Sequence, residues 1–283
     1  MKFTKMHGCG NDYVYVETMT QEVENRSEIA IKYSDRHFGI GGDGVIFINK
    51  SDIADFVMEM YNADGSRGKM CGNGIRCVAK FVYDKGFTTK NPLTIESFGS
   101  VKTLYLTLKD NKVEKVRVDM GEPILDCNEI GMDATHLLDK PDDCNRVIDA
   151  AYLVDGNEKH MTAVSMGNPH AVVFVDDTKN IEMEKIGNAY EHHPAFPEGV
   201  NTEFIRVISK SEIEMRVWER GSGETLACGT GACASVTACV LNNLTDRKVT
   251  VHLLGGDLEI EWNKEDNHIY MTGPATTVFE GEV

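Results

Sequence analysis

The sequence has no long hydrophobic run and no excess of basic residues. Its 283 residues contain no stretch of about 18 apolar residues, so no membrane-spanning helix is expected. The amino-terminal segment also lacks the apolar core and cleavage site of a secretory signal, which favours a cytoplasmic location. Lysine and arginine number 29 against 45 aspartates and glutamates, giving a net charge of −16. A phosphate backbone needs a basic footprint, so nucleic-acid binding is not expected.

Signatures of metal ions and nucleotide cofactors are missing or out of context. The eight cysteines include no CxxC pair, and neither HxxxH nor HExxH occurs, so no metal site is expected. Free thiols are favoured over disulfides in a reducing compartment. Residues 39–44, GIGGDG, match the dinucleotide pattern GxGxxG, but a helix-like segment precedes them and a strand-like segment follows. We therefore expect no nicotinamide or flavin cofactor.

The sequence does contain an internal repeat with an offset of 157 residues. CGNG at 71–74 recurs as CGTG at 228–231, and Asn11 corresponds to Asn168, each before a strand-like segment. Several landmarks at one offset predict two similar domains derived from a duplicated gene. Further pairs at this offset are Asn62 with Glu219 and the helix-like segments 22–38 with 180–193.

Each half has the same predicted order of elements: a strand, an amphipathic helix, alternating strands, and a helix directly after the cysteine. These last helices are expected at 73–85 and 230–242. The predicted class is α+β, with two pseudo-symmetric domains, each a curved, mainly antiparallel sheet wrapped around a central helix. We expect domains of residues 1–120 plus 272–283 and 121–271, with the active site in the cleft between them. A helix C-terminal cap is expected at Gly86, and hairpin turns at Asp110-Asn111 and Gly255-Gly256.

Each half places a cysteine directly before a glycine-flanked helix start. A helix N-terminus exposes free N–H groups and about half a positive charge, which suit a carboxylate. The same field is expected to lower the pKa of Cys71 and Cys228 from the usual value of about 8.5. If pseudo-symmetry makes the thiols face each other, one thiolate removes an α-proton while the opposite thiol returns a proton to the other face. The pattern predicts a cofactor-free racemase or epimerase, with the helix starts stabilising the enolate-like charge.

The other cysteines and the histidines carry weaker patterns. His170, in GNPH, fits a structural role as well as a functional one. His192-His193 is expected to be a solvated helix end. The cysteines expected in the core, inside the predicted helices, are Cys77, Cys233 and Cys239. No function is assigned to Cys9, Cys127 and Cys144, which have no mirrored partner.

Six segments carry a resemblance to a known family: MHGCGNDYVYV, NADGSRGKMCGNGIRC, AVSMGNPHAVV, GVNTEF, ERGSGETLACGTGACA and YMTGPA. In this order, from residue 1 to the C-terminus, the chain resembles diaminopimelate epimerases. The resemblance implies interconversion of LL- and meso-2,6-diaminopimelate on the route to lysine and peptidoglycan. It also implies no pyridoxal phosphate or other cofactor, and a homodimer.

The resemblance further implies roles for single residues. Cys71 and Cys228 would be the base and acid pair, and His170 and Glu219 would line the reacting centre. The residues at the two helix starts would offer backbone amides to the reacting α-carboxylate, and a planar guanidinium suits the far carboxylate. The implied substrate-binding residues are Asn11, Asn62, Gly72, Asn73, Asn168, Asn201, Glu219, Arg220, Gly229 and Thr230.

The sequence departs from the family pattern at Gly44, where many relatives have glutamine, and at Cys9, where an apolar residue is common. Phe279 stands where a tyrosine makes a dimer contact in some relatives. One alternative is another cofactor-free isomerase of this architecture, resembling proline racemases or the phenazine-biosynthesis isomerases. The asparagine set and Arg220 argue against it, because a proline-sized substrate has no far carboxylate. A thiol-redox or metal-binding module is the other alternative, and the missing CxxC counts against it.

Overall fold

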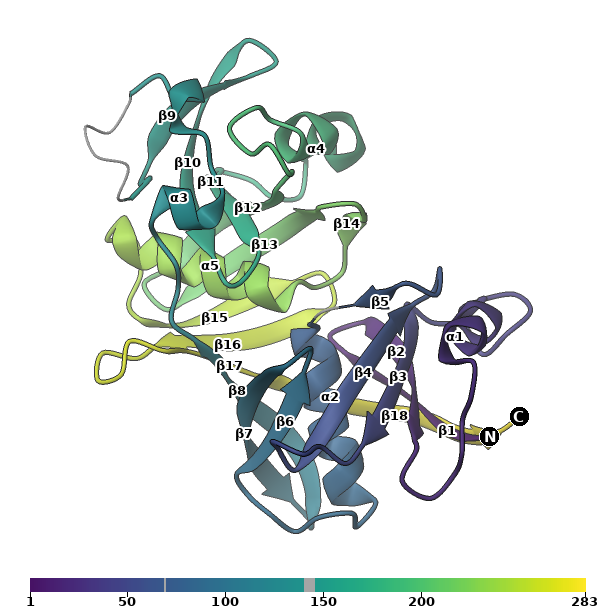
Figure 1. Ribbon diagram of the computed structural model, residues 1–283. Helices are drawn as coiled ribbons and strands as arrows, with labels where there is room; N and C mark the ends of the chain where they lie inside the picture. Colours follow the sequence, from purple (N-terminus) through teal and green to yellow (C-terminus); the bar gives the residue numbers. More distant parts are fainter. Residues whose placement is uncertain (69, 140–145) are drawn as a thin grey trace. The chain divides into compact units, whose positions relative to one another are not determined.

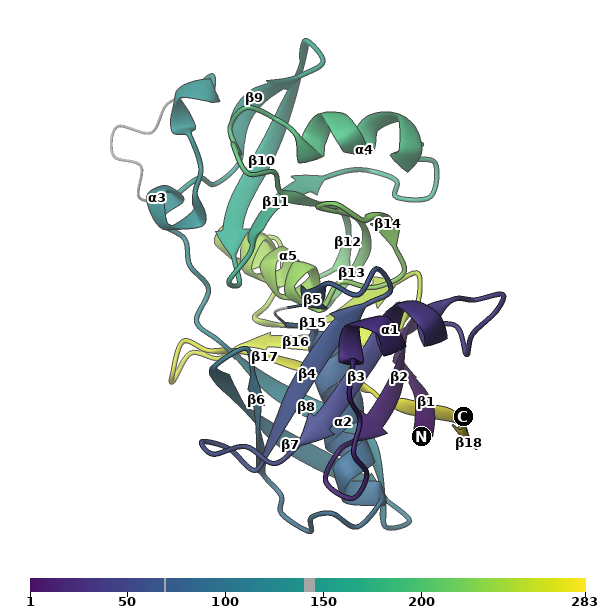
Figure 2. The same cartoon turned by 45° about the vertical axis from the view of Figure 1, so that its right-hand side comes forward.

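A computed structural model describes residues 1–68, 70–139 and 146–283. By their contacts, these residues divide into two compact units: unit 1 contains residues 1–119 and 272–283, and unit 2 contains residues 120–271. Each unit is a curved, mainly antiparallel sheet wrapped around one long helix (Figure 1 and Figure 2). This α+β architecture with two similar units confirms the predicted fold class. Within the described ranges, no helix has the length and apolar character needed to cross a membrane.

Unit 1 begins with a parallel pair of strands inside an otherwise mostly antiparallel sheet. β2 pairs in parallel with β3 and antiparallel with β1, and β18 completes the edge beyond β1. The elements are β1 (Lys2–Gly8), β2 (Asn11–Glu17), α1 (Arg26–Ser34), β3 (Gly44–Asn49), β4 (Phe56–Asn62), β5 (Arg67–Gly68), α2 (Gly72–Asp84), β6 (Leu93–Ser97), β7 (Ser100–Lys109), β8 (Lys112–Gly121) and β18 (Thr276–Glu282).

Unit 2 repeats this order. β11 pairs in parallel with β12, and antiparallel β10 and β13 flank this pair, while β13 also pairs in parallel with β15. The elements are α3 (Cys127–Ile130), the short 3-10 helix η1 (Ala134–His136), β9 (Ala150–Val154), β10 (Asn157–Ser165), β11 (Pro169–Phe174), α4 (Met183–Glu191), β12 (Asn201–Ser209), β13 (Glu212–Glu219), β14 (Gly223–Thr225), α5 (Gly229–Leu241), β15 (Lys248–Leu253), β16 (Gly256–Trp262) and β17 (Ile269–Pro274).

The strand register repeats the offset found in the sequence. In unit 1, Tyr13 of β2 lies opposite Gly44 of β3. In unit 2, His170 of β11 lies opposite Asn201 of β12. Both pairs differ by 157, since 170 − 13 = 157 and 201 − 44 = 157. The two units therefore share not only the order of their elements but also the pairing that positions the residues after Asn11 and Asn168.

The central helices α2 and α5 are buried along most of their length, because each sheet curves around its helix. Both begin one residue earlier than expected, so Cys71 and Cys228 are the N-cap residues themselves. Gly86 follows the C-cap of α2 with a φ of 80°, which confirms the expected left-handed helix end. The buried residues of each helix, including those of its first turn, hold the helix start in position within its unit.

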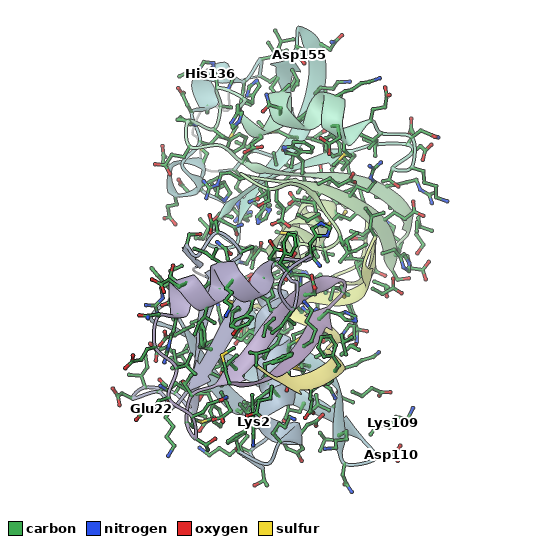
Figure 3. The ribbon with its side chains drawn as sticks, turned by 90° about the vertical axis from the view of Figure 1, so that its right-hand side faces the viewer. Lys2, Glu22, Lys109, Asp110, His136 and Asp155 are labelled. Carbon is green, nitrogen blue, oxygen red and sulfur yellow. The ribbon has the colours of Figure 1, made fainter. Side chains whose placement is uncertain are left out.

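The turns follow the sequence signals closely. Asp110 and Asn111 both have positive φ, 50° and 60°, as a tight hairpin between β7 and β8 requires. Figure 3 labels Lys109 and Asp110 at the tip of this hairpin. The second hairpin turns one residue earlier than expected, because Leu253 pairs with Gly256. The expected helices at 22–38 and 180–193 are shorter: α1 and α4 each have nine residues.

Buried thiols at Cys77, Cys233 and Cys239 confirm the predicted core positions. Burial raises the pKa of Cys77 to about 11 and that of Cys239 to about 12, so both stay protonated at neutral pH. The expectation of free thiols is wrong at Cys127, which is disulfide-bonded. Cys144 lies outside the described residues.

Of the two histidines expected to be solvated after α4, His192 is exposed as expected, but the expectation is wrong for His193. The His192 side chain is 63 % exposed. His193 is buried, donates from Nε2 to the Leu153 carbonyl at 2.9 Å, and accepts at Nδ1 from the Ala195 N–H. The chain folds back after the helix, so a residue near its end is covered by β9. Burial lowers the pKa of His193.

Candidate active site

The thiol of Cys71 caps the first turn of α2 in unit 1. Cys71 has extended backbone angles, φ −138° and ψ 108°, and its Sγ accepts from the Gly74 N–H at 3.2 Å. The S–H donates to Asn11 Oδ1 at 3.1 Å. Two residues that are 60 positions apart in the chain are therefore in direct contact.

Asn11 is itself held by a residue that the sequence reasoning passed over. Its Nδ2 donates to Asp43 Oδ2 at 2.7 Å, and the same oxygen accepts from the Asp12 N–H at 3.0 Å. Arg36 binds the other carboxylate oxygen of Asp43 at 2.9 Å. Because Nδ2 is bound to Asp43, the Oδ1 of Asn11 is directed to Cys71. The signal for Asp43 was present in GIGGDG, which forms the loop between α1 and β3.

Gly44 follows directly, and its lack of a side chain has a steric cause. A Cβ atom at Gly44 would lie 2.1 Å from the Tyr61 carbonyl oxygen and 2.9 Å from the Tyr13 ring. A backbone oxygen in β4 cannot move away without disturbing its strand pairing. A larger side chain at this position therefore has no room in unit 1 as it stands.

The thiol of Cys228 caps α5 in unit 2 in the same manner. Its backbone angles are φ −117° and ψ 113°, and its Sγ accepts from the Gly231 N–H at 3.4 Å. Thr230 Oγ1 lies 3.5 Å from the sulfur. Both expected thiols therefore have the same relation to a helix start, although Cys71 is half-buried and Cys228 only 6 % exposed.

The expected low pKa is wrong at Cys228. Burial raises the pKa of this thiol well above its ordinary value, and the carboxylates of Glu219 and Glu203 raise it further. The Thr230 hydroxyl and the Gly231 N–H act in the opposite direction but are weaker. A helix terminus stabilises a charge by at most about 2 kcal/mol, whereas full burial shifts a pKa by up to about 5 units. In unit 2 burial prevails, and the thiol keeps its proton.

Glu219 lies near this thiol at the end of β13. The Thr225 hydroxyl donates to its Oε1 at 2.5 Å. Burial raises the pKa of Glu219, and the Glu203 carboxylate adds to that effect, while Thr225, Cys228 and His170 lower it. A carboxyl with a raised pKa beside a protonated thiol is typical of a site that moves protons.

His170 is the second polar group of unit 2 that the sequence singled out, and it is wholly buried. Its Nδ1 lies 2.7 Å from Glu203 Oε1, and its Nε2 lies 3.1 Å from Asn168 Oδ1. The structure therefore brings together Asn168 and His170 as expected, and adds Glu203. Glu203 stands in the GVNTEF segment, where a charged residue in a buried strand was the available signal.

Asn201 and Arg220 are joined to one another and to backbone. Asn201 Nδ2 donates to the Pro169 carbonyl at 2.9 Å, and its Oδ1 accepts from the Arg220 N–H at 3.0 Å. The Arg220 guanidinium is exposed and donates to the Glu198 carbonyl at 3.1 Å. Asn201 thus ties the segment before His170 to the segment after Glu219.

The remaining expected residues lie at or near the two helix starts. Asn62, at the end of β4, donates from Nδ2 to Ser66 Oγ at 3.0 Å. Asn73 Oδ1 accepts from the buried Arg76 guanidinium at 2.9 Å. The residues whose backbone N–H groups belong to the first turns are Gly72 and Asn73 in α2, and Gly229 and Thr230 in α5.

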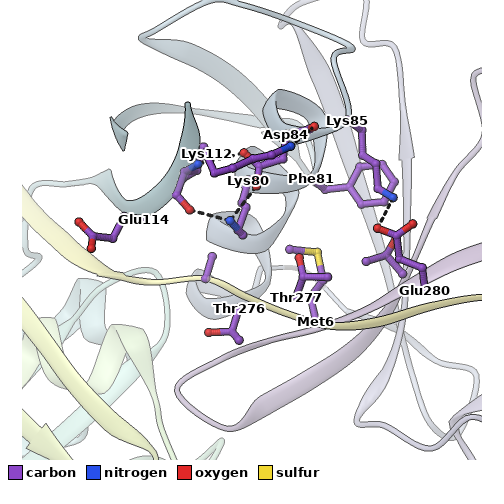
Figure 4. A pocket seen from close by; sticks show the side chains of 13 residues that line it. Met6, Lys80, Phe81, Asp84, Lys85, Lys112, Glu114, Thr276, Thr277 and Glu280 are labelled. Atoms are coloured by element: carbon purple, nitrogen blue, oxygen red, sulfur yellow. Dashed lines mark hydrogen bonds and ion pairs between the residues drawn. The ribbon is translucent and has the colours of Figure 1, made fainter. Parts of the chain in front are cut away.

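Other possible binding features lie apart from these residues. In the part of the chain that the structure describes, no three His, Cys, Asp or Glu side chains cluster as metal ligands do. Figure 4 shows a cavity of about 610 Å³ in unit 1. Its lysines are engaged: Lys80 binds Asp84, Lys112 binds the Asp84 carbonyl, and Lys85 pairs with Glu280. Among the described residues, none of the expected site residues lines this cavity.

Several solved structures with similar folds are named as racemases, epimerases or isomerases. A phenazine-biosynthesis protein of the PhzF family from Bacillus anthracis aligns over all of this chain and 98% of its own, with a TM-score of 0.67 and 17% identity. A probable proline racemase from Agrobacterium radiobacter aligns over all of this chain and 92% of its own, with a TM-score of 0.67 and 13% identity. At these identities the likeness concerns the fold.

Sequence comparison is more specific. The family model described as diaminopimelate epimerase matches residues 3–125 and 162–278. A diaminopimelate epimerase from Agathobacter rectalis is 57% identical over 283 residues, covering all of this chain and 99% of that protein. One from Methanococcus maripaludis is 55% identical over the same length, again covering all of this chain and 99% of its own. The chain belongs to the diaminopimelate epimerase family.

Proposed function

We propose that the protein interconverts LL- and meso-2,6-diaminopimelate by proton transfer at one α-carbon, without a cofactor. The observation that carries this proposal is the pair of cysteine N-caps, which repeat one geometry at two helix starts. The family membership supplies the substrate. As a further part of the proposal, the domains of residues 1–120 plus 272–283 and 121–271 enclose the active site between them, with the two thiols on opposite sides of the substrate.

In the proposed reaction, the thiolate of one cysteine takes the α-proton and the electron pair of the C–H bond moves into the carboxylate. The resulting enolate-like charge lies at the first turns of α2 and α5, where N–H groups stabilise it. The thiol of the other cysteine then donates its proton to the opposite face of the α-carbon. Because Cys228 holds its proton firmly in the free enzyme, it suits the donor role in the direction that starts with Cys71 as base.

The polar residues around the thiols have proposed roles in binding. Glu219 and His170 line the reacting centre, and Glu219 binds the reacting ammonium. Asn11, next to Cys71, and Asn168, next to His170, contact the substrate's polar groups. The exposed Arg220 guanidinium offers a bidentate site for the far carboxylate. Asn62 and Asn201 complete the proposed set.

The test is solvent exchange at the α-carbon. We expect enzyme in deuterium oxide with EDTA to form meso product from LL-diaminopimelate and to place deuterium at one α-position, as followed by proton NMR. If neither exchange nor meso product appears, the proposed function is wrong. Cys71→Ala and Cys228→Ala should each abolish epimerisation, because two-base inversion needs both thiols. Cys239→Ala, which removes a core thiol of α5, is the control and should keep its activity.

We further propose a homodimer in the cytoplasm. Val278 and Phe279 on β18 are 55 % and 45 % exposed, an apolar pair at the edge of the unit 1 sheet. Both expected catalytic cysteines are free thiols, as a reducing compartment keeps them, and this supports the proposed location although Cys127 is disulfide-bonded. Sedimentation should give a dimer, and Phe279→Asp should shift it toward monomer. A wild-type monomer at micromolar concentration would contradict the dimer, and recovery outside the cytoplasmic fraction would contradict the location.

A further inference from the structure

The buried carboxyl group of Glu203 lies near the Cys228 thiol, and the sequence assigned it no role. Glu203 projects from β12 and is fully buried, as is its partner His170. Its Oε1 lies 2.7 Å from His170 Nδ1. Its Oε2 has no hydrogen-bond partner among the described residues. A carboxyl group with one oxygen unpartnered in the interior is costly, so the contact of its other oxygen with the His170 ring is what stabilises it.

The fold does not require a carboxylate at this place. The equivalent position in unit 1 is residue 46, since 203 − 157 = 46, and it is Ile46. A Cβ atom on Gly231 would lie 2.5 Å from Glu203 Oε1, and one on Gly74 would lie 2.8 Å from Ile46 Cδ1. The same space beneath the two helix starts is thus filled by an acid in unit 2 and by an aliphatic side chain in unit 1.

His170 differs from its counterpart in the same way. Its equivalent is Tyr13, since 170 − 157 = 13, and Tyr13 lies opposite Gly44 as His170 lies opposite Asn201. The acid and the imidazole therefore occur together in one unit and are both absent from the matching positions of the other. Paired replacement of this kind points to a joint task for Glu203 and His170.

We propose that Glu203 is a positioning residue that holds His170 by Nδ1–H and directs Nε2 toward Asn168. The inference rests on the proposed function, because it assigns His170 a set tautomer and ring orientation beside the reacting centre. With Nδ1 donating to the carboxylate, Nε2 is the nitrogen that meets substrate-side groups.

The titratable groups around the pair are few among the described residues. Glu219 reaches it from β13, and Cys228 from the start of α5. The strand neighbours of His170 do not titrate: they are Val164 on β10 and Asn201 on β12. On the far side of Glu203, the strand neighbour in β13 is Val217. The Glu203 carboxylate raises the pKa of Glu219 and of Cys228, so removing its negative charge favours the deprotonated form of both.

Two variants separate the charge of Glu203 from its hydrogen bond. Glu203→Gln keeps the size and an oxygen that accepts from Nδ1–H, but it is neutral. Glu203→Ile introduces the isoleucine found at the equivalent position of unit 1, and it removes both the charge and the hydrogen-bond acceptor. Thr202→Val is the matched control: it alters a buried neighbour on β12 whose side chain points to the other face.

The first measurement needs no activity. Long-range proton–nitrogen NMR reports the tautomer and pKa of each histidine, and loss of one signal in His170→Gln assigns it. We expect Glu203→Ile to change the tautomer pattern of the His170 ring nitrogens, because Nδ1–H loses its acceptor, whereas Glu203→Gln should keep the Nδ1–H form. Thr202→Val should leave the pattern unchanged. An unchanged His170 pattern in Glu203→Ile overturns the inference.

The second measurement is the pH dependence of epimerisation. We expect the limbs of kcat/KM to move to lower pH in Glu203→Gln, and kcat to fall by about 100-fold in Glu203→Ile with little change in KM, because the imidazole loses its orientation. Full kcat in Glu203→Ile overturns the inference. If the wild type itself does not epimerise diaminopimelate, the proposed function fails, while the NMR result still decides the role of Glu203.

Discussion

Thr225 controls the charge of Glu219, and its removal gives a quantitative test of the unit 2 site. In the structure the Thr225 hydroxyl donates to Glu219 Oε1 and lowers the pKa of that carboxyl against burial and Glu203, which raise it. A hydrogen bond to a charged group contributes about 1.5–3 kcal/mol. Each pKa unit corresponds to about 1.36 kcal/mol. Thr225→Val should therefore raise the pKa of Glu219 by about one to two units.

The sign follows from the form that is stabilised. The lost hydrogen bond favoured the ionised carboxylate, so the proton binds more tightly in the variant. If ionised Glu219 is needed to bind the substrate ammonium, the acidic limb of kcat/KM moves to higher pH by about one to two units. The activity at high pH should be retained. The variant should also lose stability above the pKa of Glu219 and little below it, because a protonated carboxyl has less need of the donor.

The assay is epimerisation in deuterium oxide, followed by loss of the α-proton signal across a pH series. Thr225→Ser is the control, because it keeps the hydroxyl and should keep the wild-type limb. Thermal unfolding at two pH values checks the stability effect separately. An acidic limb that stays in place in a folded Thr225→Val enzyme would refute the assignment of that limb to Glu219.

Three further predictions concern other parts of the chain. Burial lowers the pKa of His193, so the free energy of unfolding should fall as the pH drops below about 6.5. The fall should be smaller in His193→Gln, and an equal dependence on pH in the two proteins, measured by urea unfolding, would contradict this. Gly187→Ala should destabilise the protein by about 1–3 kcal/mol in urea unfolding, because its Cβ would lie 2.1 Å from the Trp218 ring, and an unchanged midpoint would contradict the packing. The oxidant diamide should inactivate the enzyme by linking Cys71 and Cys228, and dithiothreitol should restore it, whereas oxidised enzyme with full activity would show that the thiols do not meet.

Several local features of the chain were predictable, because each depends on residues that are adjacent in the sequence. A cysteine followed by glycines at a helix start, positive φ at Asp110-Asn111 and a helix end at Gly86 depend on a few adjacent residues. The offset of 157 residues added the relation between the two units. With the family motifs, these signals predict Cys71 and Cys228 as the catalytic pair.

Partners far apart in the chain were not predictable in this way. Asp43 binds Asn11 across 32 residues, and Glu203 binds His170 across 33. Neither pair follows a helical or strand spacing, since each contact depends on parallel strands whose register is set by the whole sheet. In the sequence, Asp43 stood out only as part of GIGGDG, which matches the dinucleotide-binding pattern without its structural context.

The sequence by itself determined the repeat, the two helix starts and the thiol placed at each of them. Only the tertiary structure decided how those thiols differ. A helix terminus lowers the pKa of a thiol by a local field, and that much can be inferred from residues 228–231. At Cys228 the burial of the sulfur and the approach of Glu219 and Glu203 act against this field and prevail. Burial and long-range charge are properties of the folded unit, so no local pattern contains them.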